Sequence, residues 1–156
     1  MSVTKVKEYL KKYGREADVI ELQESSATVE LAAQALGCEP KRIAKTLSFE
    51  ADGRIILIVT AGDAKIDNPH YKEKFSCKAR MLPADEVEER IGHAVGGVCP
   101  FAVKEQVEVY LDVSLKRFET VFPAAGSSNS AICLTIPELE EYSAYRDWID
   151  VCKGWE

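Results

Sequence analysis

The sequence is poor in the residues and motifs from which most enzyme and metal sites are built. Its 156 residues include two histidines, His70 and His93, and five widely spaced cysteines with no CxxC pair. A zinc ribbon and a thioredoxin-type redox site are therefore unsupported. The patterns GxGxxG, GxxxxGKS/T, GxSxG and HExxH are also absent. These are the signatures of dinucleotide binding, phosphate-loop NTPases, α/β-hydrolases and zinc proteases.

Long hydrophobic runs are absent as well. The longest, Ile55–Val59, is far shorter than the about 20 apolar residues of a transmembrane helix, and it indicates a buried strand. The first 14 residues, MSVTKVKEYLKKYG, are charged throughout and lack the apolar stretch of a signal peptide. We therefore expect a cytoplasmic protein with reduced thiols and no membrane partner.

Basic residues are fewer than acidic residues. Twenty Lys and Arg stand against 26 Asp and Glu, which gives a net charge of −6 and a pI near 5.1. This balance argues against a DNA-binding protein that relies on many phosphate contacts. A locally basic side could still meet an anionic ligand, although a charge run is also typical of a plain solvated surface. The locally basic residues are Lys41, Arg42, Lys45, Lys65, Lys72, Lys74, Lys78 and Arg80.

The composition is that of a globular domain, with 46% hydrophobic and 29% charged residues. No repeat, linker or low-complexity tract divides the chain, so we expect a single domain over residues 1–156. Hydrophobic periodicity and end signals predict helices over 2–13, 28–36, 67–74, 83–91 and 137–142, with single helical turns at 40–43 and 115–117. Strands are predicted over 18–23, 44–51, 54–61, 78–82, 107–111 and 148–151. Segments 120–124 and 131–136 bracket a glycine-containing loop, and the irregular alternation predicts a mixed α/β (α+β) fold.

The clearest local signal is a hairpin. Two apolar segments, AKTLSFEA and RIILIVTA, flank Asp52-Gly53, a pair that favours a two-residue hairpin turn. The second segment is apolar on both faces. We therefore expect it to be a central strand covered on both sides.

Three features could carry chemistry. Lys45 lies in an otherwise apolar strand, where it either faces solvent or points into a cleft to meet a phosphate or carboxylate. The loops 96–101 and 126–130 contain glycine, which lets the backbone approach a ligand, although both could be plain connections. A nucleophilic pair of Cys99 with His93 is conceivable, but no local pattern supports it.

Taken in order, these segments resemble the YbaK/EbsC family, which is similar to the editing domain of bacterial prolyl-tRNA synthetases. No single segment is specific, but their order and spacing are. The matching segments are TVELAAQALG at 28–37, RIAKTL at 42–47, AGD at 61–63, GHAVGGVCPF at 92–101 and AGS at 125–127.

The resemblance implies a curled, barrel-like mixed sheet with short helices outside and a site in a cleft. It implies that Lys45 holds the terminal adenosine or its phosphate, and that the backbone of the loop 96–100 positions the ester. Catalysis would be largely substrate-assisted, without metal or organic cofactor. The residues implied as catalytic are Lys45, Gly96 and Gly97. Those implied as substrate-binding are Thr28, Thr46, Asp63, Val98, Cys99, Pro100, Phe101, Gly126 and Ser127.

The implied function is hydrolysis in trans of a mischarged aminoacyl-tRNA, bound by its 3′ acceptor end. A tRNA-Pro carrying a small wrong amino acid such as Cys or Ala is the expected substrate, and prolyl-tRNA synthetase is a candidate partner. Two alternatives stay open: a non-catalytic module that binds tRNA, a nucleotide or a synthetase, and a hydrolase for another activated ester.

Four positions depart from the family pattern or leave a role open. Ala102 replaces a common glycine, and Ala124 and Ala131 stand near positions where some members have a polar contact. The identity of the amino acid is therefore not carried over. Cys99 either lines the pocket or packs in the core.

Overall fold

A curled mixed sheet with helices around it forms the fold, as the resemblance to the family implies. The computed structural model describes residues 2–23 and 28–155. Its main sheet has the strand order β8-β6-β2-β3-β5-β9. These strands are β2 (Ile43–Ala51), β3 (Arg54–Ala61), β5 (Glu108–Asp112), β6 (Thr120–Pro123), β8 (Leu134–Thr135) and β9 (Asp147–Ile149).

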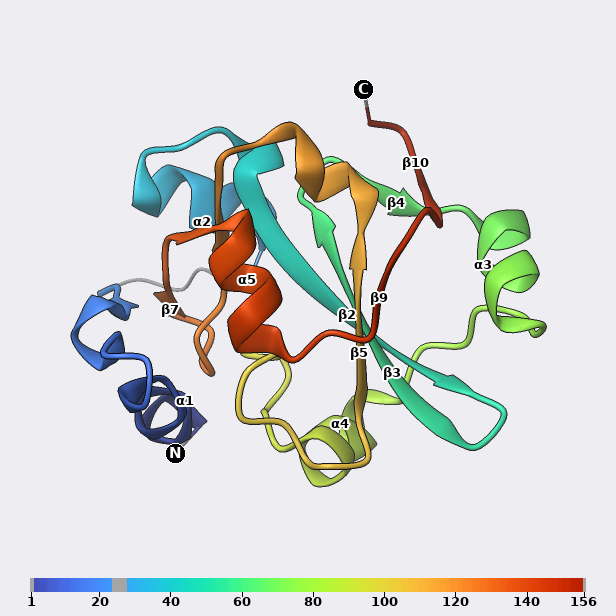
Figure 1. Cartoon of the computed structure of the whole chain (residues 1–156), viewed down its shortest axis with the longest axis horizontal. Helices are drawn as coiled ribbons and strands as arrows, with labels where there is room; N and C mark the ends of the chain where they lie inside the picture. Colours follow the sequence, from blue (N-terminus) through green and yellow to red (C-terminus); the bar gives the residue numbers. More distant parts are fainter. Residues whose placement is uncertain (1, 24–27, 156) are drawn as a thin grey trace.

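Two small antiparallel ribbons flank the main sheet. β1 (Ile20–Glu21) pairs with β7 (Ser130–Ala131), and β4 (Lys65–Ile66) pairs with β10 (Cys152–Lys153). The α-helices are α1 (Ser2–Lys11), α2 (Val29–Leu36), α3 (Asn68–Phe75), α4 (Ala84–Ile91) and α5 (Ile136–Ser143), and the 3₁₀ turns are η1 (Glu16–Asp18), η2 (Pro40–Arg42) and η3 (Val113–Arg117). Figure 1 shows α3 at one flank of the sheet and α2 and α5 at the other. None of the helices in the described ranges is long and apolar enough to cross a membrane.

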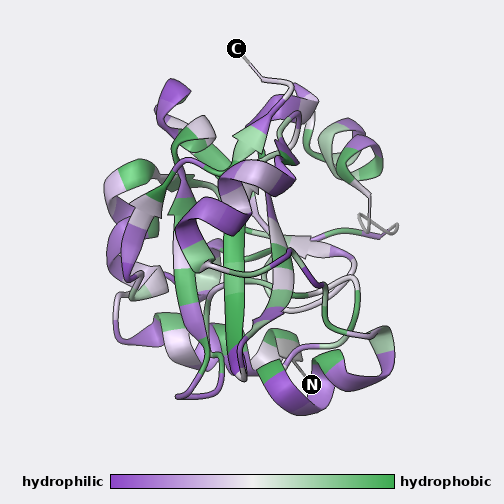
Figure 2. Cartoon of the chain, turned by 90° about the vertical axis from the view of Figure 1, so that its right-hand side faces the viewer, coloured by the Kyte–Doolittle hydropathy of each residue, from purple (hydrophilic) through white to green (hydrophobic). Residues whose placement is uncertain are grey.

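The predicted hairpin forms the centre of the sheet. Asp52 and Gly53 both have positive φ angles, 54° and 83°, which the type I′ turn between β2 and β3 requires. β3 lies between β2 and β5 and is buried from Ile55 to Ala61, so its prediction as a central strand is confirmed. In Figure 2 the hydrophobic colour concentrates in the central strands, while the surrounding helices carry most of the hydrophilic colour.

Aromatic packing shows which side of the sheet α3 covers. The rings of Phe49 and Tyr71 have centroids 5.1 Å apart, and those of Phe75 and Tyr110 are 5.3 Å apart. Because side chains alternate along a strand, the odd-numbered residues of β2 share this face with Phe49. The even-numbered residues of β2 therefore point to the opposite face.

The helix ends follow the predicted signals. Thr28 caps α2 by accepting a hydrogen bond from the Leu31 N–H at 3.2 Å, and Gly37 ends the helix in the left-handed conformation. The turn η2 begins with Pro40, as expected of a residue with no N–H to donate.

The predicted strand over 78–82 is wrong. Only Met81 forms an isolated bridge, to Phe49, while the Glu50 N–H donates to the Arg80 carbonyl and the Leu82 N–H donates to the Ser48 carbonyl. The segment leaves β2 after Leu82 because α4 begins at Ala84, with Pro83 at its N-cap.

Two further expectations need correction. The strand over 18–23 is reduced to Ile20–Glu21 and is preceded by the turn η1. The ribbon of β4 and β10 was not predicted, because two-residue strands carry no periodic signal.

A buried carboxylate fastens the C-terminal segment to the sheet. Asp112 is fully buried, and its two oxygens accept hydrogen bonds from the N–H groups of Ser114 and Val151, each at 3.0 Å. Asp112→Ala would leave both donors buried without an acceptor, at about 1–3 kcal/mol each.

We therefore expect Asp112→Ala to lower the free energy of unfolding by roughly 2–5 kcal/mol in urea titrations, and Asp112→Asn to lower it less. A loss of less than about 1 kcal/mol for the alanine variant would contradict the assigned role.

Candidate functional site

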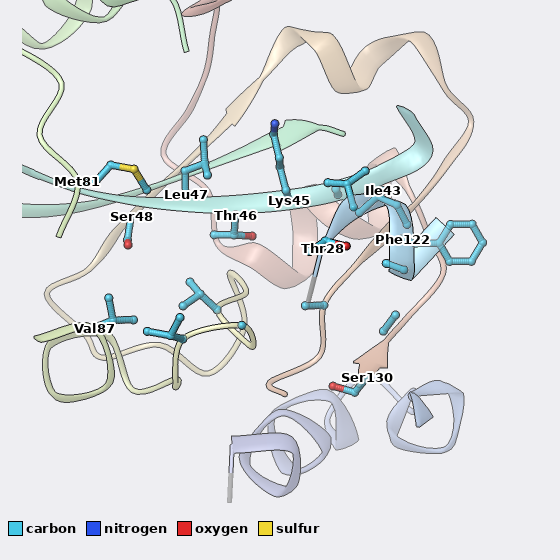
Figure 3. A pocket seen from close by; sticks show the side chains of 18 of the residues that line it. Thr28, Ile43, Lys45, Thr46, Leu47, Ser48, Met81, Val87, Phe122 and Ser130 are labelled. Atoms are coloured by element: carbon cyan, nitrogen blue, oxygen red, sulfur yellow. The ribbon is translucent and has the colours of Figure 1, made fainter. Parts of the chain in front are cut away.

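A cavity of about 410 Å³ opens along the free edge of β2. This volume lies within the range of small-molecule sites. Its walls come from β2, α2, α4, the loop after α4 and the segments around β6 and β7, and Figure 3 shows its lining. The lining is mainly apolar, with polar side chains contributed by Thr28, Lys45, Thr46, Ser48 and Ser130.

The edge is open because the pairing of β2 is interrupted. β6 pairs with β2 only at Ile43 and Ala44, and on the other side of the gap the Ser48 carbonyl binds the segment around Met81. The hairpin register makes the odd-numbered residues of β2 the ones that bond to β3. The N–H and C=O of Thr46 therefore point away from β3, into the gap.

The side chain of Thr46 is also unsatisfied. Its Oγ1 is buried and has no hydrogen-bond partner among the residues that the structure describes. Figure 3 shows Thr46 and Ser48 on the side of β2 that faces Val87 and Ser130. Since buried polar groups in native proteins are nearly always paired, this hydroxyl lacks a partner that the described residues do not supply.

Lys45 reaches the cavity from the opposite face of β2. Figure 3 shows Lys45 and Leu47 on the side of the strand away from Thr46 and Ser48. Lys45 is half-buried, and none of the described acidic side chains pairs with it within 4 Å. Burial lowers the pKa of its ammonium group, so a ligand anion would be a favourable partner.

The glycine loop after α4 is fixed against the second glycine loop. A Cβ on Gly97 would lie 2.7 Å from the Gly126 carbonyl and from Cα of Ser127, so only glycine fits there. Gly96 has a φ of 90° and, with Val98, lines the cavity. Gly97 therefore sets the distance between the two loops, while Gly96 faces the ligand space.

The following residues of this loop turn into the core. Cys99 and Phe101 are fully buried, and the Cys99 Sγ lies 3.6 Å from His93 Nε2. The same Nε2 lies 2.6 Å from the Phe101 carbonyl oxygen, to which it donates. Burial raises the pKa of the Cys99 thiol to about 12 and lowers that of His93. The two residues are adjacent, but Nε2 carries a proton and cannot act as the base for the thiol.

Asp63 lies outside the cavity. Its two oxygens accept hydrogen bonds from Arg117 at 2.6 and 3.0 Å, and this guanidinium lowers the pKa of the carboxyl group. Ser127 bonds within its own loop, with its Oγ 2.7 Å from that of Ser130.

The structure thus brings part of the predicted set together. The predicted residues that line the cavity are Thr28, Lys45, Thr46, Gly96 and Val98. Those that do not are Asp63, Gly97, Cys99, Pro100, Phe101, Gly126 and Ser127. The sequence analysis missed several other residues that line the cavity. The alternation of side chains along β2 could have identified Ser48, which lies on the same face as Thr46. Only the folded structure shows that four more residues line the cavity: Met81, Val87, Phe122 and Ser130.

The comparisons with known proteins define the family. The sequence-family model for the aminoacyl-tRNA editing domain matches residues 23–142. The chain belongs to this family. The editing domain is 57% identical to the uncharacterized protein YwhH of Bacillus subtilis, with full coverage of both chains. It is 30% identical to the proline–tRNA ligase of Bacillus licheniformis over 75% of this chain and 21% of the ligase.

Solved structures agree with this assignment. A protein described as a candidate trans-editing enzyme for prolyl tRNA synthetase superimposes with a TM-score of 0.88 at 28% identity, over 98% of both chains. The hypothetical protein APE2540 gives a TM-score of 0.84 at 29% identity, over 96% of this chain and 99% of that one. The resemblance to the editing domain of prolyl-tRNA synthetase and the curled-sheet fold are confirmed.

The burial of Cys99 makes a direct prediction. In the native editing domain we expect Cys99 to resist alkylation by iodoacetamide at pH 8, because its thiol is buried and protonated, and to react once urea unfolds the chain. Cys77, which is partly exposed, is the internal control. Peptide mass spectrometry measures both, and labelling of Cys99 as fast as Cys77 before unfolding would contradict the buried placement.

Proposed function

We propose that the editing domain hydrolyses, in trans, the ester bond of a mischarged aminoacyl-tRNA. The observation that carries the proposal is the cavity at the open edge of β2, which Gly96 lines. The ammonium of Lys45, which has no acidic partner among the described residues, lies on one side of the strand. Support for action in trans comes from the likeness to the candidate trans-editing enzyme over 98% of both chains.

The reaction needs positioning more than strong acid–base groups. Water adds to the ester carbonyl carbon, the bond to the ribose oxygen breaks, and that oxygen takes a proton, which releases the amino acid and the tRNA. The ester is already activated, so orientation and shelter of the developing charge supply most of the rate. A hydroxyl of the terminal ribose, or the side chain of the amino acid itself, would activate the nucleophile.

The chain contributes binding groups to this reaction. Lys45 would meet the terminal adenosine or its phosphate, and the backbone at Gly96 would hold the ester. The N–H and C=O of Thr46 would contact the aminoacyl group. The described residues contain no cluster of three His, Cys, Asp or Glu side chains placed to hold a metal. We propose a mechanism without metal or organic cofactor, as the resemblance to the family implies.

The cavity suits a small, uncharged side chain. Within the part of the chain that the structure describes, no Asp or Glu lines it, and Ala124 and Ala131 form part of its wall. The small, uncharged side chain of Cys or Ala attached to tRNA-Pro fits such a lining. We propose this substrate, prolyl-tRNA synthetase as a partner, a cytoplasmic location, and a single functional unit over residues 1–156.

One observation favours a second candidate function. None of the described residues that line the cavity is a His, Asp, Glu or Cys, so these residues supply no ordinary general base there. A non-catalytic module that binds aminoacyl-tRNA would need none.

A panel of mischarged tRNAs separates these functions. We expect the wild-type protein to release Cys or Ala from tRNA-Pro faster than buffer does, with or without EDTA, and to leave Pro-tRNA-Pro intact. Binding without hydrolysis would show the non-catalytic module, and equal hydrolysis of simple acyl esters that lack tRNA would show a general esterase. Loss of activity in EDTA would contradict the metal-free mechanism.

Substitution of Lys45 tests the site itself. We expect Lys45→Ala to lower kcat/KM for deacylation at least tenfold, which corresponds to about 1.4 kcal/mol of transition-state stabilisation. Lys45→Arg should retain more activity than Lys45→Ala but less than the wild type, since a planar guanidinium keeps the charge but not the shape of an ammonium group.

Lys72→Ala, on the exposed side of α3, is the matched control and should leave the rate unchanged. Circular dichroism checks that each variant is folded. Near wild-type turnover of folded Lys45→Ala would contradict the assignment.

A further inference from the structure

A pair of lysines faces each other on the ribbon of β4 and β10. Lys65 and Lys153 are directly opposite in the antiparallel register, and both are exposed. Opposite residues in such a pair project to the same side, and like charges there are destabilising. The Lys153 ammonium lies 3.9 Å from one oxygen of Asp67, whose other oxygen lies 2.5 Å from the His70 ring. None of the described acidic side chains pairs with Lys65 within 4 Å. An anion bound between the lysines would relieve their repulsion.

A hollow beside this ribbon adds two further cations. It is lined by Lys41, Asp63, Arg117, Phe118 and Gly154. Among the described lining residues Asp63 is the one carboxylate, and both of its oxygens are bound to Arg117. Lys41 lies 3.6 Å from Glu39, in a pair whose two side chains are both exposed, and water weakens such a surface pair.

Aromatic rings stand next to these cations. The guanidinium of Arg117 lies 4.7 Å from the ring centroid of Phe118 and 4.9 Å from that of Trp155. Basic side chains interleaved with aromatic rings are typical of surfaces that bind single-stranded nucleic acid, where bases stack and phosphates pair.

This surface adjoins Lys45. Figure 1 shows η2, η3, β4 and β10 together at the end of the molecule where β2 begins. Lys65 and Asp63 are near enough to shift the pKa of Lys45, and Lys41 is near enough to shift that of Asp63. Glu30 is the other acid that acts on Lys45. Since the whole chain carries a net charge of −6, the concentration of cations at this end is local.

We infer that the basic end, defined by Lys41, Lys65, Arg117 and Lys153, binds the phosphodiester backbone of the single-stranded 3′ end of tRNA. The strand would then pass Lys45 and place its aminoacyl group across the open edge of β2 into the cavity. This inference rests on the proposed function and names the surface that would deliver its substrate. It differs from the basic stretch that the sequence suggests at Lys72, Lys74 and Lys78, in and just after α3.

The test compares two double variants of equal charge change. Lys65→Ala/Lys153→Ala removes the facing pair, and Lys72→Ala/Lys74→Ala removes two lysines of α3. Each is assayed on mischarged tRNA and on aminoacyl-adenosine, which carries the same ester without a phosphate. Thermal unfolding confirms that both variants are folded.

We expect Lys65→Ala/Lys153→Ala, the ribbon variant, to have a KM for the mischarged tRNA about tenfold above that of the wild type. Its kcat and its hydrolysis of aminoacyl-adenosine should be unchanged. The slope of log KM against log salt should become shallower by about 1.4, or about 0.7 for each of two lost phosphate contacts on a single strand. The α3 variant should behave as the wild type.

Other outcomes overturn the inference. Equal loss on both substrates would place these lysines in the catalytic machinery, and an effect confined to the α3 variant would move the docking surface to α3. If the wild type hydrolyses neither ester, the proposed function fails, and the surface is then tested by filter binding of uncharged tRNA. Unchanged binding by the ribbon variant in that assay would overturn the inference on its own.

Discussion

The interrupted pairing of β2 is the constraint on which the site depends. The strand pairs with β3 at eight consecutive positions, from Ala44 to Ala51, but with β6 only at Ile43 and Ala44. One edge of a central strand is therefore left without a neighbour in the middle of the sheet. An open edge presents unpaired N–H and C=O groups, and here they face a cavity instead of another strand.

The alternation of side chains along β2 places two different binding groups, a cation and a hydroxyl, at the same open edge. Thr46 and Lys45 are adjacent in sequence, so their side chains leave opposite faces of the sheet. The cavity extends around the open edge and includes both residues. A ligand lying across the edge could place an anionic part near Lys45 and an uncharged part near Thr46. The loops opposite are held by close contact of Gly97 with Gly126 and by the hydrogen bond from His93 to Phe101, so little reordering would accompany binding.

Local signals predicted the elements that local chemistry determines. The hairpin followed from Asp52-Gly53 between apolar segments, and α2 followed from its threonine cap and terminal glycine. Lys45 stood out because a cation in an apolar strand is costly to bury.

The features that depend on tertiary contacts could not be predicted in this way. The ribbon of β4 and β10 joins segments far apart in sequence, and it is too short for a periodic pattern. Nothing in the loop 96–101 reveals that the chain turns at Cys99 from the cavity into the core. Asp63 lies in a matching motif, yet only the fold places it against Arg117.

The central claim is that the aminoacyl end of the substrate binds at the open edge of β2. The most direct test is titration of the ¹⁵N-labelled protein with an adenosine whose 3′-aminoacyl group is held by an amide, which resists hydrolysis. We expect saturable chemical-shift changes that are largest at the backbone amides of Thr46, Gly96 and Val98. Saturable binding with shifts centred elsewhere, and none at Thr46, would contradict it.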